Sequence, residues 1–223
     1  MKFVHVLVEG QTEETFLRNV LNPYLQDYDV FLTAKIITTK HVNTGKDFKG
    51  GGSDYKKIRN DLCRLLGDNS VAAVTTMIDY YGLPADFPGK STIQGNNCFD
   101  RVSYLEEQFA MDIKKERFIP FLVLHEFEAY LFTLPECLVD AFPELGDKEK
   151  KELMQIEKNF NSPEEINGGK TTHPSACIDR LIPAYGKVYG SIITKRIGLT
   201  AIKKRCPHFN KWISTLELIG RKE

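Results

Sequence analysis

Five carboxylates stand at or near the ends of apolar segments of the chain, a grouping that suits metal chemistry. Glu9, Asp79 and Glu126 each follow such a segment, the last after one intervening histidine. Glu13 stands four residues beyond Glu9, and Glu128 stands two beyond Glu126. Gathered in one place, these acids would repel one another unless they were protonated or neutralised by a cation. Hard carboxylate oxygens of this kind suit Mg²⁺ or Mn²⁺.

Each acid also has an ordinary structural interpretation. Glu13 suits the first turn of any helix, because the helix dipole favours negative charge there. Asp79 before a turn is typical of an Asx-turn, and Glu126 and Glu128 fit the exposed start of a helix. For any single acid this interpretation is the stronger one, whereas the repetition at three segment ends favours a metal site.

The segments that precede these acids are predicted strands, and predicted helices alternate with them. Apolar and β-branched residues predict buried strands at 3–8, 30–38, 71–78 and 119–124. Helical spacing predicts helices near 12–25, 54–66, 99–111, 135–142, 147–159, 174–185, 188–205 and 207–219. This order predicts an α/β fold, with a mostly parallel four-stranded sheet flanked by helices and a helical C-terminal extension.

We therefore expect an α/β core over residues 1–133 and a helical extension over residues 134–223, packed on the same domain. Ligands of open parallel sheets bind beyond the carboxyl ends of the strands, where the acids would lie. Residues 40–53 contain three consecutive glycines and are expected to form a flexible loop, after which Ser53 or Asp54 caps the next helix.

Composition narrows the class of protein. The chain has 223 residues and no formal net charge, and no segment reaches the roughly 18 apolar residues that span a bilayer. Its five cysteines are scattered and form no CxxC pair, which argues against a disulfide framework or a structural zinc site. We expect a soluble protein of the reducing cytoplasm. The chain also lacks a P-loop, so we do not expect it to hydrolyse ATP itself.

The C-terminal part is basic. From Arg180 onward the chain has ten Lys or Arg and two acids. Such a surface can attract a polyanion, although a solvated helical face is the plainer interpretation. The candidate nucleic-acid contacts are Lys195, Arg196, Lys203, Lys204 and Arg205. Lys187 could neutralise phosphate, and His125 could be either a core residue or a base.

Several strings resemble a known family. VEGQTE at 8–13 resembles the opening motif of the OLD-type nucleases, which have a Toprim domain. TMIDYYGLP at 76–84 and HEFEA at 125–129 resemble a narrower, uncharacterised bacterial family of Toprim-like proteins, often encoded beside an ABC-type ATPase. The resemblance implies a Toprim-like fold, Mg²⁺-dependent action on nucleic-acid phosphodiesters, an ATPase partner and a role in phage defence.

The resemblance also implies residue roles. Glu9 would bind metal or act as a general acid or base, Asp79 would bind metal, and Glu13 would hold a second metal. One departure stands out, because the usual Toprim Asp-x-Asp is here Asp79-Tyr80-Tyr81.

The acid missing at Tyr81 leaves two functions open. Asp86, or Glu126 and Glu128, would replace it in an active nuclease or nicking enzyme. Without a replacement, the chain would be a non-catalytic regulatory or sensor subunit that binds the ATPase. A different phosphoryl-transfer enzyme with a nucleotide substrate is a third possibility.

Overall fold

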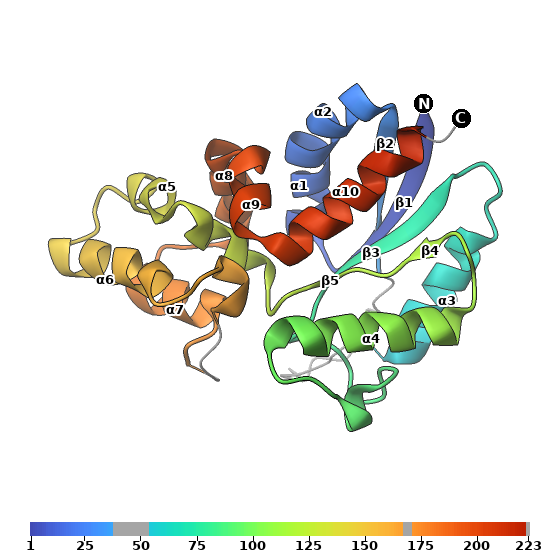
Figure 1. The fold of residues 1–223 in the computed structure, drawn as a ribbon. Helices are drawn as coiled ribbons and strands as arrows, with labels where there is room; N and C mark the ends of the chain where they lie inside the picture. Colours follow the sequence, from blue (N-terminus) through green and yellow to red (C-terminus); the bar gives the residue numbers. More distant parts are fainter. Residues whose placement is uncertain (38–53, 167–170, 222–223) are drawn as a thin grey trace, which may run out of the picture.

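A parallel sheet forms the centre of the protein in this computed structural model, which describes residues 1–37, 54–166 and 171–221 (Figure 1). Its strands are β1 (Lys2–Val8), β2 (Val30–Ile36), β3 (Ala73–Asp79), β4 (Phe118–Ile119) and β5 (Leu122–Val123). The order is β2-β1-β3-β4, β5 also pairs with β3, and all these pairings are parallel. The α/β fold with a mostly parallel sheet is therefore confirmed.

The strand order creates a switch point at the centre of the sheet. From β1 the chain passes to β2 on one side, and from β2 it returns to β3 on the other side of β1. The connections after β1 and β3 therefore lead away from each other, and open parallel sheets bind their ligands beyond the strand ends at such a point. This is the place at which Glu9 and Asp79 stand in the sequence.

The fourth predicted strand is divided into β4 and β5. Pro120 lies between them and has no N–H group to donate to a sheet. The Thr76 hydroxyl bridges this break: it donates to the Phe121 carbonyl (2.7 Å) and lies 3.0 Å from the Phe121 N–H, which donates to it in turn. A buried threonine in β3 thus satisfies the backbone that the proline disrupts.

Two helices cover one face of the sheet. They are α3 (Tyr55–Leu66), capped by Asp54 as expected, and α4 (Cys98–Ile113). Their apolar residues, among them Ile58 and Phe109, pack against Leu7 and Val74 of the strands. The predicted loop 40–53 and the end of the predicted strand at Thr38 lie outside the described residues.

The other face is covered by both ends of the chain. The segment α1 (Gln11–Phe16), η1 (Leu17–Leu21), α2 (Asn22–Leu25) and η2 (Gln26–Tyr28) packs there beside α10 (Pro207–Arg221). Pro23 lacks an N–H and would leave a carbonyl of a regular helix unpaired. The helix widens to a π-helical turn at η1 instead, in which the Asn22 N–H donates to the Leu17 carbonyl.

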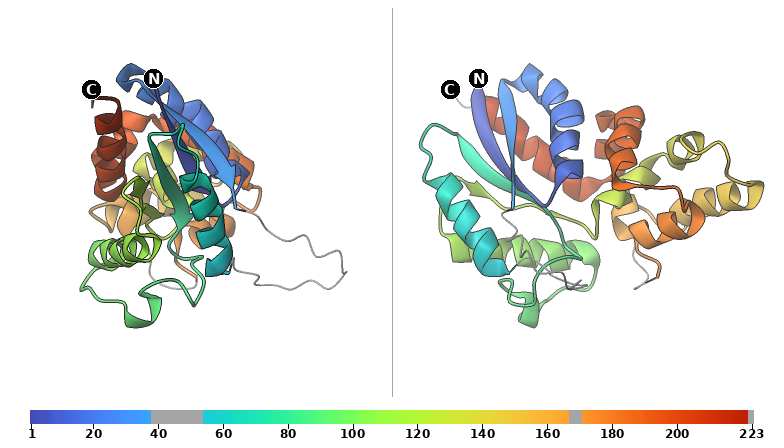
Figure 2. Two further views of the ribbon diagram at one scale, coloured as in Figure 1. Left: turned by 90° about the vertical axis from the view of Figure 1, so that its right-hand side faces the viewer. Right: turned by 180° about the vertical axis from the view of Figure 1, so that it is seen from behind.

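The remaining helices form a lobe at one end of the sheet (Figures 1 and 2). They are η4 (Phe127–Thr133), α5 (Pro135–Asp140), α6 (Asp147–Lys158), η5 (Pro163–Glu165), α7 (Pro174–Leu181), α8 (Lys187–Ile197) and α9 (Leu199–Arg205). The predicted helix 188–205 is divided by Gly198, whose φ of +81° suits a residue without a Cβ. No helix of the described ranges is long and apolar enough to cross a membrane.

The last helix leaves this lobe and returns to the sheet. α10 contacts β2, and its Trp212 donates from the indole N–H to Thr75 of β3 (2.9 Å). The division of the chain after residue 133 remains a prediction. Within the predicted extension 134–223, α10 covers the sheet and is not part of the lobe.

Candidate functional site

Glu9 and Asp79 meet at the switch point between β1 and β3. The backbone N–H of Asp79 donates to the Glu9 carboxylate (Oε1, 3.1 Å). The Asp79 carboxylate (Oδ1) in turn accepts from the N–H of Phe127, the first residue of η4 (3.1 Å). The ends of β1 and β3 and the start of η4 are thereby joined through two acids.

The starts of two further helices hold the neighbouring acids. Glu13 in α1 is buried, and its Oε2 accepts from the N–H of Gly10 (3.0 Å). Glu126 accepts through Oε2 from the N–H of Ser175, the second residue of α7 (3.0 Å). Backbone N–H groups at the start of a helix favour negative charge. Together with the contacts of Glu9 and Asp79, these contacts position four carboxylates from three separate parts of the sequence.

Glu128 completes the carboxylate cluster, which we define as Glu9, Glu13, Asp79, Glu126 and Glu128. It is buried in η4, and the hydroxyl of Tyr185 donates to its Oε1 (3.4 Å). The sequence suggested Glu126 and Glu128 as the exposed start of a helix. In the structure this helix is a 3₁₀ turn in which Glu128 is buried. The charges of the other four acids all act on Asp79 and raise its pKa.

The protonation of the cluster reflects burial and mutual repulsion. Burial, and then the charges of Glu9 and Glu13, raise the pKa of Asp79 well above its ordinary value. Burial first, and Glu13 and Glu126 next, raise the pKa of Glu9 to about 7 although part of this residue reaches solvent. Burial also raises the pKa of Glu13 and of Glu128. The cluster thus holds more negative charge than its surroundings stabilise.

Lys187 brings a positive charge to this cluster. It is the first residue of α8, a helix that packs against α1, and its carbonyl accepts from the hydroxyl of Thr12 (3.4 Å). Its charge lowers the pKa of Glu9, Glu13 and Glu128. Lys187 was a candidate from the sequence, but nothing in the sequence placed it near the acids. Its position there results from the packing of α8 on α1.

His173 is a neighbour of the cluster that the metal-ligand pattern did not select. Its Nδ1 lies 3.2 Å from Glu126 Oε2 and 3.1 Å from the hydroxyl of Ser175. The ring centroid lies 5.0 Å from that of Tyr81, with the two planes inclined by 32°. The His-Pro pair that begins α7 marks a helix start in the sequence, but not its proximity to the acids.

Two other candidate residues differ from the cluster in their surroundings. Asp86 is exposed on the loop after β3, and among the described residues no hydrogen bond or ion pair joins it to these acids. His125 is buried, has a φ of +63°, and its pKa is lowered to about 4 by burial. It lines a separate cavity of about 430 Å³ with Asn97, Arg101 and Asn161.

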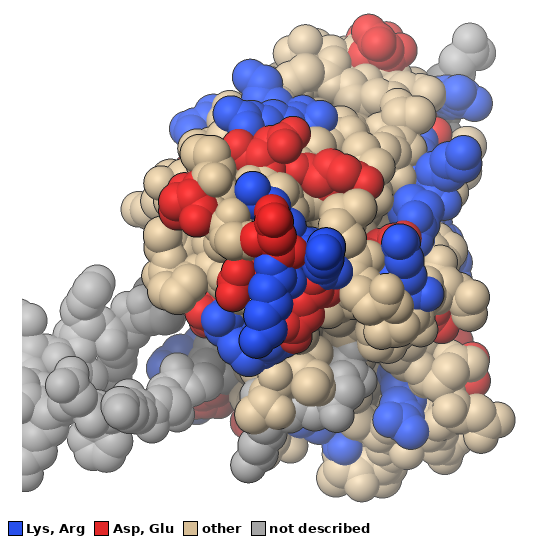
Figure 3. Space-filling model, turned by 90° about the vertical axis from the view of Figure 1, so that its left-hand side faces the viewer, with Lys and Arg blue, Asp and Glu red and all other residues tan. Residues whose placement is uncertain are grey.

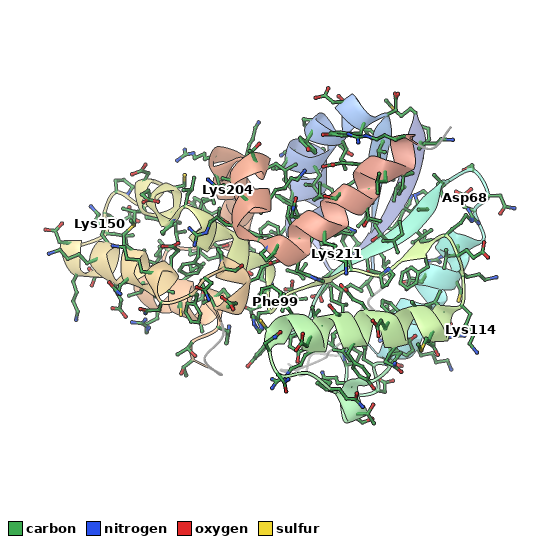
Figure 4. The ribbon with its side chains drawn as sticks, in the orientation of Figure 1. Asp68, Phe99, Lys114, Lys150, Lys204 and Lys211 are labelled. Atoms are coloured by element: carbon green, nitrogen blue, oxygen red, sulfur yellow. The ribbon has the colours of Figure 1, made fainter. Side chains whose placement is uncertain are left out.

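The basic candidates are divided by their environment. Lys203 pairs with Glu217 and donates to the hydroxyl of Tyr24 (2.8 Å), and Arg205 pairs with Glu157. The others are exposed: Lys195, Arg196 and Lys204, the last on α9 (Figure 4). On the face of the lobe in Figure 3, basic and acidic side chains alternate rather than form one positive surface.

The cluster fits a hard divalent cation in the chemistry of its donors. It offers carboxylate oxygens with raised pKa values, which a cation would lower by favouring the charged forms. As the side chains are placed, no three His, Cys, Asp or Glu of the described ranges surround a common point able to hold a metal. Glu9, Glu13, Asp79 and Glu126 are bonded to backbone N–H groups instead.

Comparisons with known proteins give one family and one structural similarity. A family described as "Domain of unknown function (DUF4276)" matches residues 8–217. No curated protein matches the chain. Among solved structures, the C-terminal region of the Burkholderia pseudomallei OLD protein is similar at 13% identity, with a TM-score of 0.46 and coverage of 97% of this chain and 99% of that one.

Proposed function

The chain belongs to the DUF4276 family of domains of unknown function, and we propose that it is a Mg²⁺- or Mn²⁺-dependent nuclease or nicking enzyme. One observation carries the proposal: Glu9 and Asp79 meet at the switch point of a parallel sheet, and the charges of Glu13, Glu126, Glu128 and Lys187 act on one or both of them. Ligand sites of such sheets lie at this point. A divalent cation would neutralise the excess negative charge of this carboxylate cluster.

The residues divide the work as follows. Glu9, Asp79 and Glu126 would hold the ion, with Glu13 and Glu128 available for a second one. When bound, the metal would stabilise charge on the scissile phosphate and lower the pKa of a water molecule. The backbone bonds to Glu9 and Asp79 keep both carboxylates beside the ends of β1 and β3.

Lys187 could bind a substrate phosphate beside the carboxylate cluster. Its charge already acts on three carboxylates of the cluster, so a phosphate bound there lies within its reach. Lys187 would therefore offset the repulsion between the acids and the substrate.

A second candidate function rests on Tyr81. A tyrosine stands where related Toprim motifs carry a second acid, and it packs on His173 rather than serving as a ligand. This observation favours a non-catalytic regulatory or sensor subunit that binds an ABC-type ATPase. The sequence resemblance implies such an ATPase and a role in phage defence for either function.

The two functions are separated by a cleavage assay. The purified chain is incubated with Mn²⁺ or Mg²⁺ and labelled single- and double-stranded DNA and RNA, alone and with ATP and the ABC-type ATPase that the resemblance implies. We expect metal-dependent cleavage that Glu9→Gln and Asp79→Asn each reduce at least 100-fold, while the exposed control Glu144→Gln cleaves like the wild type. Inert wild-type protein under every condition would reject the nuclease in favour of the binding subunit.

A further inference from the structure

We infer that Tyr81 is a stacking platform for an unpaired nucleobase beside the carboxylate cluster, an inference that rests on the proposed function. The residue belongs to none of the carboxylate contacts. The residue is 42% exposed, although it stands only two residues after Asp79. Large aromatic rings in contact with solvent are the surfaces on which proteins bind unpaired bases.

The backbone fixes Tyr81 relative to the acids. Its N–H donates to the carbonyl of His125 (3.0 Å), which continues the pairing of β3 with the segment of β5. The next residue, Gly82, donates its N–H to the carbonyl of Asp79 (3.2 Å), so residues 79–82 form a closed turn. A Cβ added at Gly82 would lie 3.6 Å from Glu9 Oε1. The turn that carries Tyr81 therefore lies against the cluster itself.

The ring is supported on one side. The ring of His173 lies against it at 5.0 Å between centroids. His173 is held in turn by Glu126 and by the hydroxyl of Ser175, at 3.2 and 3.1 Å from its Nδ1. Its side chain is only 17% exposed, whereas Tyr81 remains open to solvent. A base that stacks on the open surface of Tyr81 would meet a ring that is already positioned, so less side-chain entropy is lost on binding.

The chemistry of an aromatic face defines the ligand. Every nucleobase has a π-face, so the platform would select bases that are free of a duplex rather than a particular sequence. The sugar-phosphate next to such a base would lie within reach of the cluster. The inferred ligand is thus a single-stranded nucleic acid, or an unpaired nucleotide within a structured one.

Fluorescence tests the stacking without any cleavage. Tyr81→Trp places an indole at the platform, while the natural Trp212 is buried, stacked on Phe121 at 4.2 Å, and serves as a constant background. Adenosine and ribose are titrated into Tyr81→Trp and into the wild type. We expect adenosine to quench the emission of the variant, with no quenching by ribose and none in the wild type. Equal emission with and without adenosine would overturn the inference, whether or not the chain is a nuclease.

Cleavage kinetics test the same platform in the proposed reaction. Tyr81→Phe keeps the ring and should retain kcat/KM within twofold, whereas Tyr81→Leu should lose about tenfold or more on single-stranded substrates. Tyr189→Leu is the matched control, because Tyr189 is 40% exposed and packs on Phe142 at 4.9 Å.

An abasic series separates stacking from a structural effect. A series of oligonucleotides carries one abasic site each, at successive positions. At one of these positions, wild type and Tyr81→Leu should cleave with equal kcat/KM, because no base is left to stack. If the wild type cleaves and Tyr81→Leu cleaves equally well on every substrate, the platform is wrong and the nuclease stands. If nothing is cleaved but adenosine quenches Tyr81→Trp, the nuclease is wrong and the platform stands.

Discussion

The backbone N–H of Asp79 donates to the carboxylate of Glu9 over 3.1 Å and ties the end of β3 to the end of β1. The carboxylate of Asp79 is itself held by the N–H of Phe127. An amide at position 79 can preserve both contacts, since its backbone N–H and its Oδ1 remain. Charge at this position is therefore separable from structure.

Asp79→Asn should leave the metal-free protein as stable as the wild type or more stable. The pKa of Asp79 is raised well above its ordinary value by burial and by Glu9 and Glu13, so its charge is unfavourable in the folded state. Each 1 kcal/mol of relieved repulsion would raise Tm by about 2–4 °C in a chain of this size. Thermal unfolding monitored by circular dichroism in EDTA measures the effect.

The same variant should lose the response to metal. Mn²⁺ at about 100 times its Kd would stabilise the wild type by roughly 2.7 kcal/mol, and Asp79→Asn by much less. Asp86→Asn is the matched control, because Asp86 is exposed and outside the carboxylate cluster. An equal Mn²⁺-induced rise in Tm for wild type and Asp79→Asn would remove Asp79 from the metal site.

Metal affinity should rise with pH. Carboxylates bind metal in their ionised form, and the pKa of Glu9 is raised to about 7. We expect Mn²⁺ binding to tighten by about tenfold or more from pH 6 to pH 8, as measured by calorimetry. Lys187→Met removes a charge that lowers the pKa of Glu9, so it should move this rise to higher pH, and Lys187→Arg should restore it. A pH-independent Kd over this range would contradict the assignment of Glu9 as a ligand.

The sequence predicted the sheet because its local signals agreed with the fold. Apolar, β-branched segments became β1 and β3, and the acid that ends or follows each one lies at the switch point of the strand order. The proximity of Glu9 and Asp79 was predictable for this reason: strand ends are visible in a sequence, and parallel strands end on the same edge. Asp54 likewise caps α3, because capping is a local property.

Features that depend on distant packing were not predictable in the same way. His173 reaches Glu126 only because α7 packs against η4, and Lys187 reaches the acids only because α8 packs against α1. The division of the fourth strand required the hydroxyl of Thr76, a contact 45 residues away in the chain. Asp86 stands near Asp79 in sequence, yet the turn after β3 leaves it exposed.

A buried carboxylate far from the cluster should make stability depend on pH. Glu164 is fully buried and accepts from the N–H groups of His208 and Phe209 at the start of α10. Burial raises its pKa from 4.5 to about 7. The folded state therefore binds this proton more tightly than the unfolded state. Protonation of Glu164 therefore contributes to the free energy of unfolding. This contribution is fully present below about pH 4.5 and is lost as the pH rises through about 7, by at most roughly 3 kcal/mol.

Glu164→Gln should flatten this dependence. Urea unfolding at pH 5 and pH 8 should show a smaller loss of stability in Glu164→Gln than in the wild type. The variant should also be less stable at pH 5 by about 1 kcal/mol, because its amide nitrogen cannot accept one of the two N–H groups. The exposed residue Glu144 provides the control Glu144→Gln. Identical pH dependence in wild type and Glu164→Gln would show that Glu164 does not titrate in this range.

The basic residues of α8 and α9 should divide into two groups when nucleic acid binding is measured. Lys195, Arg196 and Lys204 are exposed, so a phosphate can reach them, whereas Lys203 and Arg205 pair with Glu217 and Glu157. If the exposed group binds nucleic acid, each contact releases a counterion and steepens the salt dependence of binding. Changing Lys195, Arg196 and Lys204 together to Glu should reduce the slope of log Kd against log salt by about 2–3.

Lys203→Ala and Arg205→Ala should instead lower Tm and leave that slope near its wild-type value. Fluorescence anisotropy with a labelled oligonucleotide at 50 to 300 mM salt provides the slopes. A slope unchanged by the triple substitution would assign these lysines and arginine to a solvated face, and a slope reduced only by Lys203→Ala and Arg205→Ala would mean that the ion pairs open when nucleic acid binds.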